Sequence, residues 1–303
     1  MNSANTAAKL QLVKPKVIPF FEEDSNTFSY VVQDPNSLAC AIIDSVLGFD
    51  MASGAIDHQS AQAIIRYVEE KKLDVEWIIE SHVHADHLSA AAYLKDFLGG
   101  KVAISEHVTK VQETFGKIFN AGDELKRDGS QFDHLFTDGE TYTIGTLQCL
   151  AMHTPGHTPA CMTHVIGDAA FVGDTIFMPD SGTARSDFPG GDAATLFQSI
   201  HKILNLPPKT RIFMCHDYGA DESREVEYLT SVKAELEGNI HVNKEVVKAD
   251  FVAMRQKRDR GLAAPHLILP ALQVNMRAGH FPPPEDNDVI YLKIPVDVLG
   301  KGK

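Results

Sequence analysis

The run His82-Val-His84-Ala-Asp86-His87 constrains this sequence more than any other feature. It follows an apolar, strand-like segment at 75–79 and precedes a helical pattern. Side chains two residues apart in an extended chain point the same way, so His82 and His84 can converge on one ion. Asp86 and His87, at the turn into the helix, can face the same cavity from a second side. The run therefore predicts a metal site between a strand end and a helix start, for one metal ion or two.

Three later residues are further candidate ligands. His157 lies in TPGHTP, where proline and glycine fix a sharp turn after a strand. Asp174 closes the apolar strand AAFVGD, and His216 follows another in IFMCHDY. A polar group at the end of a buried strand needs a partner or a metal, because unpaired burial is costly. The complete set argues against a non-enzymatic scaffold protein and indicates a metal-dependent enzyme.

The predicted elements alternate between β-rich and mixed regions. We expect strands at Val17–Phe21, Phe28–Val32, Leu38–Asp44, Val75–Ile79, Val102–Ile104, Tyr142–His153, Met162–Ile166, Ala169–Val172 and Arg211–Cys215. We expect helices at Ser60–Lys72, Leu88–Leu98, Glu106–Phe119 and Asp192–Leu204, with further helical segments to about Arg260. This order favours two facing sheets with helices outside over one doubly wound parallel sheet.

No clear linker divides the chain. Residues 1–14 are expected to form a loose arm, and 15–303 a single catalytic domain with a C-terminal extension over about 240–303. The segment FPPPEDND at 281–288 is expected to be extended, because proline forbids a helix there.

Charge and composition exclude several functions. The formal net charge of −13 disfavours binding to nucleic acid or to an anionic membrane. The four cysteines form no CxxC pair, and we expect reduced, mostly buried thiols. The N-terminus lacks a secretory h-region, and no run approaches the roughly 18 apolar residues that a membrane span needs. A soluble cytoplasmic protein is the expectation.

The sequence resembles the metallo-β-lactamase superfamily in the order of four motifs: HxHxDH, PGHTP, GD and a late histidine. The likeness extends from about Phe20 to Tyr218. It implies an α/β fold, an αββα sandwich of two mixed β-sheets flanked by helices. The superfamily includes lactamases, thioesterases, nucleases and persulfide dioxygenases, so the fold alone does not choose an activity.

Other segments resemble the persulfide dioxygenase (sulfur dioxygenase) family, in its longer bacterial form. The segment after Asp174 contains the Gly-x-x-Arg-x-Asp-Phe pattern, with Arg185, Asp187 and Phe188. CHDY at 215–218, VNMRAG at 274–279 and NTFSY at 26–30 are also similar to family segments. A cysteine that the family has near Arg185 is absent, since Thr183 and Ser186 stand there.

The resemblance implies a mononuclear Fe(II) enzyme that oxidises glutathione persulfide with O2 and water to glutathione and sulfite. The implied iron ligands are His82, His157 and Asp174, a 2-His-1-carboxylate set. It implies catalytic support from His84, Asp86, His87, His216, Arg185 and Asp187, and substrate contacts from Arg185, Tyr218 and Arg277. A homodimer is also expected from the resemblance.

The alternative is a glyoxalase II-like thioester hydrolase with two metal ions, zinc among the candidates. There Asp86, His87 and His216 would hold the second ion, and a hydroxide would attack a glutathione thioester. Every ligand for that site is also in the sequence. The Arg185-x-Asp187 and Asn275-Met276-Arg277 segments favour the dioxygenase.

Overall fold

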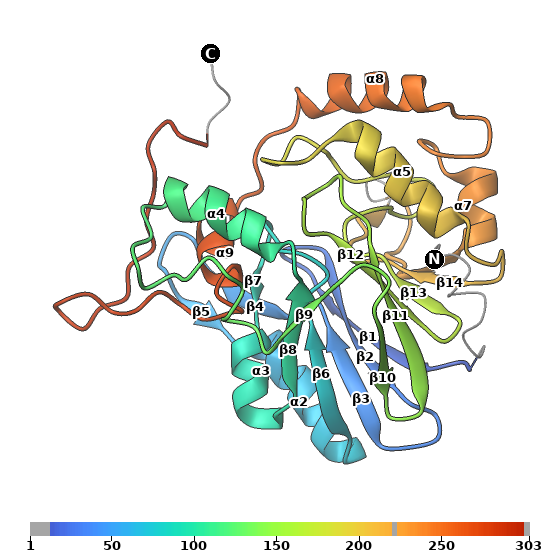
Figure 1. Cartoon of the computed structure of the whole chain (residues 1–303). Helices are drawn as coiled ribbons and strands as arrows, with labels where there is room; N and C mark the ends of the chain where they lie inside the picture. The colour runs from blue at the N-terminus through green and yellow to red at the C-terminus, as the bar shows by residue number, and fades with distance from the viewer. Residues whose placement is uncertain (1–12, 220–222, 300–303) are drawn as a thin grey trace.

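Two six-stranded mixed sheets face each other in the computed structural model, which describes residues 13–219 and 223–299 (Figure 1). The first sheet has the order β1-β2-β3-β6-β8-β9, with β1 (Lys16–Glu22), β2 (Thr27–Gln33), β3 (Ala39–Ile43), β6 (Asp74–Ile79), β8 (Lys101–Ser105) and β9 (His134–Phe136). The second has the order β10-β11-β12-β13-β14-β15, with β10 (Thr141–Ile144), β11 (Leu147–His153), β12 (Met162–Ile166), β13 (Ala169–Phe171), β14 (Arg211–Phe213) and β15 (Leu229–Ser231). Each sheet contains both parallel and antiparallel pairs, as predicted.

Alternation along the strands builds the layers. In β2, Val31 points to the outer core of the first sheet, whereas Tyr30 and Val32 point into the core between the sheets. The facing strands add Cys149 and Phe171 to that central core. Because successive strand side chains point to opposite faces, strands buried on both faces need apolar residues at nearly every position.

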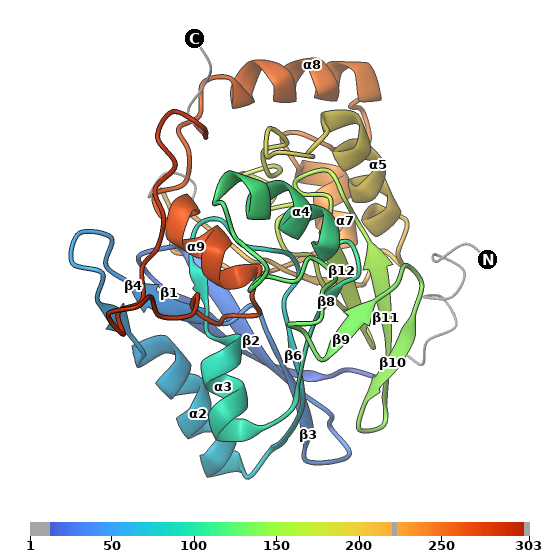
Figure 2. The same ribbon diagram turned by 60° about the vertical axis from the view of Figure 1, so that its left-hand side comes forward.

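Helices cover the two outer faces (Figure 2). The outer core of the first sheet includes residues of α2 (Gln59–Lys71), α3 (Ala91–Leu98), α4 (Val108–Ile118) and α9 (Ile268–Asn275). The outer core of the second sheet includes residues of α5 (Ala193–Leu204), α7 (Val232–Gly238) and α8 (Lys248–Asp259). The αββα sandwich expected from the sequence is confirmed.

Two predicted elements differ from the structure. The run Tyr142–His153 is not one strand but a hairpin, in which Ile144 pairs with Leu147 across a two-residue turn. Gly145 occupies this turn at φ 56°, a conformation that glycine adopts without steric cost. The helix expected from Leu88 begins at Ala91 instead, because Leu88–Ser89 form β7, which pairs with β4 (Val46–Phe49). The other partner of β4 is β5 (Ile56–Asp57).

The ends of the chain agree with the sequence as far as they are described. Most of the predicted N-terminal arm, residues 1–12, lies outside the described residues. The segment 281–288, expected to be extended, contains no helix but ends in a turn, where the N–H of Asp288 donates to the Glu285 carbonyl at 3.0 Å. All four cysteines are free and buried, as expected. No helix in the described part of the chain is long and apolar enough to cross a membrane.

Candidate metal centre

The candidate ligands lie in loops that follow strand ends at one edge of the sandwich. The run from His82 to His87 follows β6, and His157 lies between β11 and β12. Asp174 comes soon after β13, and His216 after β14. These loops come from both sheets, so the site forms only when the two sheets face each other.

His82, His157 and Asp174 form a compact group, with one potential ligand atom from each within 4.8 Å of the others. Asp174 Oδ2 lies 4.0 Å from His82 Nε2 and 3.8 Å from His157 Nε2. The second ring nitrogens are already engaged. His157 Nδ1 donates to the carbonyl of Arg185 at 2.8 Å, and His82 Nδ1 lies 3.0 Å from Ser81 Oγ. Such contacts fix ring orientation and leave Nε2 available to a metal.

A second group of potential ligands lies beside the first. His84, Asp86 and His87 also offer atoms within 4.8 Å of one another. His216 Nε2 connects the two groups, since it lies 3.2 Å from Asp174 Oδ1 and 3.3 Å from Asp86 Oδ2. The three predicted metal ligands and the supporting residues His84, Asp86, His87 and His216 are therefore brought together in one buried cluster.

Several buried polar atoms in these groups have no hydrogen-bond partner among the described residues. These atoms are His82 Nε2, His84 Nδ1 and His87 Nε2. His216 Nε2 and Asp174 Oδ1 face each other at 3.2 Å. A buried polar atom left unpaired costs roughly 1–3 kcal/mol, so three imidazole nitrogens left unpaired in one buried cluster require a common partner. Imidazole nitrogen and carboxylate oxygen are ligands for iron and zinc, and a bound metal would satisfy them. The site fits a metal ion.

Two acids that were not among the predicted site residues contact the imidazole of His84. Its Nε2 lies 3.1 Å from Asp44 Oδ1 and 3.3 Å from Glu80 Oε2. Glu80 also accepts a hydrogen bond from Ser89 Oγ. Asp44 could have been found by the reasoning that identified Asp174, because it too follows a buried strand.

Asn275 at the end of α9 holds the segment 82–89 in place, which we call the metal-binding loop. Its side-chain Nδ2 donates to the carbonyls of His84 and His87, at 2.9 and 2.8 Å. Its Oδ1 accepts from the backbone N–H of Ser89 at 2.7 Å. These three hydrogen bonds are buried, and they tie the C-terminal helix to the loop that carries most of the candidate ligands.

The electrostatics of the cluster follow from burial and from close opposite charges. Burial raises the pKa of Asp174, but the imidazoles of His216, His82 and His157 outweigh it and hold that pKa well below its usual range. Burial and neighbouring His84 push the pKa of His82 well below its ordinary value. A neutral imidazole beside an ionised carboxylate is the state that binds a metal.

The Arg185 side chain forms a fork with Asp187, with contacts of 2.5 and 2.8 Å. Its remaining terminal nitrogen donates to the carbonyl of Ala263 at 2.6 Å. Only the backbone of Arg185 contacts a candidate ligand, His157. The guanidinium is about one-fifth exposed, at 22% of the side-chain surface.

Tyr218 and Arg277, both expected to contact substrate, lie in different surroundings. The ring of Tyr218 is half exposed and stacks against His216 with a centroid distance of 6.2 Å. Arg277 is buried beside Glu124 and the carbonyl of Gln273. Gln273 and Asn275 are two residues apart on a helix, so their side chains point about 200° apart. Arg277, just past the end of α9, contacts the Gln273 carbonyl and Glu124 instead of the metal-binding loop.

The model of the family described as "Metallo-beta-lactamase superfamily" matches residues 23–216. The chain belongs to the metallo-beta-lactamase superfamily. With the histidine and aspartate cluster, this makes it a metal-dependent enzyme of that superfamily.

Named relatives of this superfamily member fall into two groups. The chain is 54% identical over 290 residues to a probable metallo-hydrolase of Burkholderia pseudomallei, covering 92% of this chain and 98% of the relative. It is 47% identical over 288 residues to glyoxylase B2 of Dictyostelium discoideum, covering 94% and 98%. It is 29% identical over 267 residues to the mitochondrial persulfide dioxygenase ETHE1 of Bos taurus, covering 87% and 89%.

A solved structure has the same fold. The crystal structure of ETHE1 from Myxococcus xanthus superposes with a TM-score of 0.69 at 24% identity, covering 88% of this chain and all of that one. At this identity the similarity shows the fold and nothing finer.

Proposed function

We propose that this enzyme is a persulfide dioxygenase that oxidises glutathione persulfide with O2 and water to glutathione and sulfite. One ferrous ion would be held by His82, His157 and Asp174. The observation that carries the proposal is that residues outside the common superfamily motifs contact these ligands and their loop. The Arg185 carbonyl accepts from His157, and Asn275 holds the carbonyls of His84 and His87. Both residues belong to the segments that resemble persulfide dioxygenases.

The chain's own groups would position the reacting atoms. Ser81 and the Arg185 carbonyl hold His82 and His157 with Nε2 available, and His216 lies against the second oxygen of Asp174. Ferrous iron, when bound, would supply open positions for sulfur and oxygen and the electrons for activating O2. In the overall reaction the S–S bond breaks, the terminal sulfur becomes sulfite, and O2 is the oxidant consumed.

A glyoxalase II-like thioester hydrolase is the second candidate function, and one observation favours it. His87 Nε2 is buried without a hydrogen-bond partner among the described residues, and His216 Nε2 lies 3.3 Å from Asp86, an arrangement that a second metal ion would require. The names metallo-hydrolase and glyoxylase among the relatives point the same way. Two ions would generate a hydroxide nucleophile at neutral pH without any need for oxygen.

Parallel assays on iron-loaded protein separate the two functions. With glutathione persulfide, an oxygen electrode and sulfite detection should show O2 uptake with sulfite formed in proportion. With S-lactoylglutathione under anaerobic conditions, hydrolysis should be slow or absent. Rapid anaerobic thioester cleavage without persulfide-dependent O2 uptake would assign the enzyme to the hydrolases instead.

A further inference from the structure

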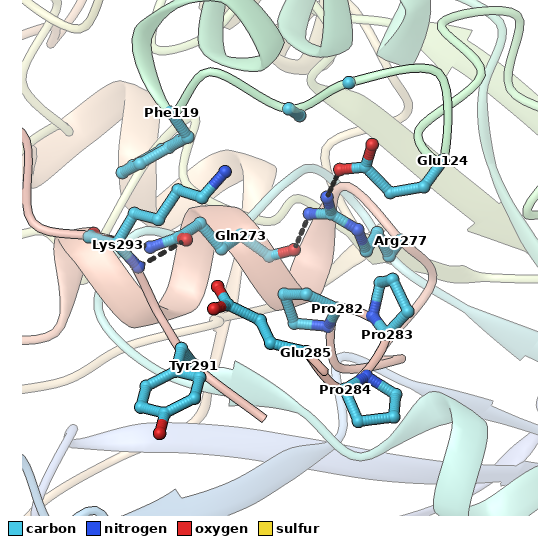
Figure 3. Close-up of a pocket in the computed structure, with 12 residues that line it drawn as sticks. Phe119, Glu124, Gln273, Arg277, Pro282, Pro283, Pro284, Glu285, Tyr291 and Lys293 are labelled. Atoms are coloured by element: carbon cyan, nitrogen blue, oxygen red, sulfur yellow. Dashed lines mark hydrogen bonds and ion pairs between the residues drawn. The ribbon is translucent and has the colours of Figure 1, made fainter. Parts of the chain in front are cut away.

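A cavity of about 320 Å³ lies against the side of α9 that faces away from the metal-binding loop (Figure 3). Residues 119–124 form one wall, and the end of α9 with Arg277 and the C-terminal segment 282–293 form the others. Asn275 reaches the metal-binding loop from the other side of this helix. The cavity is therefore separate from the metal centre, and its volume lies in the range of small-molecule sites.

Arg277 is the main reason to expect a ligand there. Its side chain is only 8% exposed, and among the described residues its one acidic partner is Glu124, at 3.4 Å. Its other contact is the Gln273 carbonyl at 2.7 Å. A guanidinium has five N–H donors, so donors remain for another group in the cavity. Burial lowers the pKa of Arg277, and the charge of Glu124 compensates for only part of this effect.

Hydrogen bonds and prolines hold the walls of the cavity in place. Gln273 binds the backbone of Lys293 on both sides, accepting from its N–H at 2.9 Å and donating to its carbonyl at 3.0 Å. The Lys293 ammonium donates to the Asn120 carbonyl at 2.9 Å. The three consecutive prolines at 282–284 add a stiff wall without N–H donors. A cavity held in this way is already organised before a ligand binds, which lowers the cost of binding.

The lining specifies the ligand's charge. The cations Arg277 and Lys293 are balanced by the acids Glu124 and Glu285, so the formal charges of the lining cancel. This balance disfavours a dianion such as a phosphate ester, because two carboxylates would repel it. Phe119 on one side and the prolines on the other provide apolar surface beside the charged groups (Figure 3). A ligand with both charges and an apolar body fits this lining.

We propose that this cavity binds an amino acid with an apolar side chain. The carboxylate would pair with Arg277, since a planar guanidinium matches a carboxylate. The ammonium group would pair with Glu285, and the side chain would lie against the prolines, which flank Arg277 and Glu285 in Figure 3.

L-Phenylalanine is the probe, measured against the full chain by calorimetry and by thermal unfolding. We expect it to bind and raise Tm. The analogues 3-phenylpropionate, which lacks the ammonium group, and 2-phenylethylamine, which lacks the carboxylate, should each bind at least about tenfold more weakly, a difference of about 1.4 kcal/mol. Equal affinity for either analogue, or no binding of L-phenylalanine up to about 10 mM, would overturn the proposal.

Two variants test whether L-phenylalanine binds in this cavity. Arg277→Gln and Glu285→Gln should each weaken L-phenylalanine binding at least about tenfold. Glu285 is exposed and lies outside α9, so its replacement should leave that helix intact. Arg66→Gln, at an exposed position on α2, is the matched control and should bind as the wild type does. Undiminished binding by folded Glu285→Gln protein would overturn the assignment, even if Arg277→Gln does not fold.

Discussion

Asn275 is the residue whose loss should most affect the metal centre without touching a metal. Replacing it with aspartate keeps the size but removes the two N–H donors to the carbonyls of His84 and His87. The new carboxylate would face these carbonyls, so the loop should shift. We expect Asn275→Asp to lose about 10–100-fold in metal affinity or turnover, the usual effect of residues that orient ligands.

Asn205→Asp, at an exposed position after α5, makes the same chemical change away from the site and serves as the control. Metal affinity can be measured by chelator competition and folding by circular dichroism. Wild-type metal affinity and turnover in folded Asn275→Asp protein would show that the metal-binding loop does not depend on the hydrogen bonds from Asn275.

His82 and His87 distinguish one metal ion from two. If only His82 is a ligand, His82→Ala should lose iron, whereas His87→Ala should retain most of its iron and lose about 10–100-fold in activity. Elemental analysis of both variants, prepared anaerobically, provides the comparison. Equal loss of metal in the two variants would support the binuclear hydrolase.

The Arg185 fork should matter for turnover and not for metal content. Lysine cannot reproduce the two parallel contacts to Asp187, because an ammonium is a single point of charge. Arg185→Lys should therefore raise KM or lower kcat severalfold, while iron per chain stays at the wild-type value, because only the backbone of Arg185 contacts His157. Unaltered kinetics would leave the Arg185–Asp187 pair with a purely structural role.

At the residue scale, the sequence predicted the clustering of the histidines and of Asp174 because each follows a strand end. It did not predict Glu80, which directly follows the end of β6 and meets His84 only in the fold. It also could not show that Arg277 contacts Glu124 instead of the metal-binding loop, because that depends on how α9 is rotated. The catalytic and substrate-binding roles of these residues stay predictions.

At the scale of elements, α7 contains a buried acid that should make stability depend on pH. Glu235 is fully buried, and one carboxylate oxygen has no partner among the described residues. Burial raises the pKa of Glu235 from 4.5 to about 8. Between these values the folded chain holds a proton that the unfolded chain has released, so this residue's contribution to stability falls as pH rises through that window.

Glu235→Gln mimics the protonated acid at every pH. The variant should unfold about 2 °C or more above the wild type at pH 8.5, with little difference near pH 4.5. Glu237→Gln, on the same helix and 60% exposed, is the control and should leave the pH profile unchanged. A Glu235→Gln profile parallel to that of the wild type would show that the acid is not protonated in the fold.

Periodicity predicted the long elements well, because strands such as Ala39–Ile43 and helices such as Ala193–Leu204 carry continuous apolar patterns. It failed for short elements. The strands β4, β5 and β7 have two to four residues each, too few to show a period, and they form through pairing with distant partners. The turn at Gly145 was missed because it interrupts the strand-forming residues on either side for only two positions.

At the scale of the whole molecule, the arrangement of layers explains why the centre needs the entire fold. The two sheets contribute ligands from opposite sides, and α9 returns from the C-terminal region to hold the metal-binding loop. The order of β-rich and mixed regions was enough to predict the sandwich. The number of metal ions does not follow from the fold, since the same cluster offers ligand atoms for one ion or two.

The central claim is a dioxygenase with one iron per chain, and an iron titration tests it most directly. Metal-free protein is titrated anaerobically with Fe(II), and O2 uptake with glutathione persulfide is measured after each addition. Activity should rise linearly and level off at one equivalent of iron per chain, with sulfite formed in proportion to O2. A plateau only at two equivalents, or no persulfide-dependent O2 uptake at any iron loading, would contradict the account.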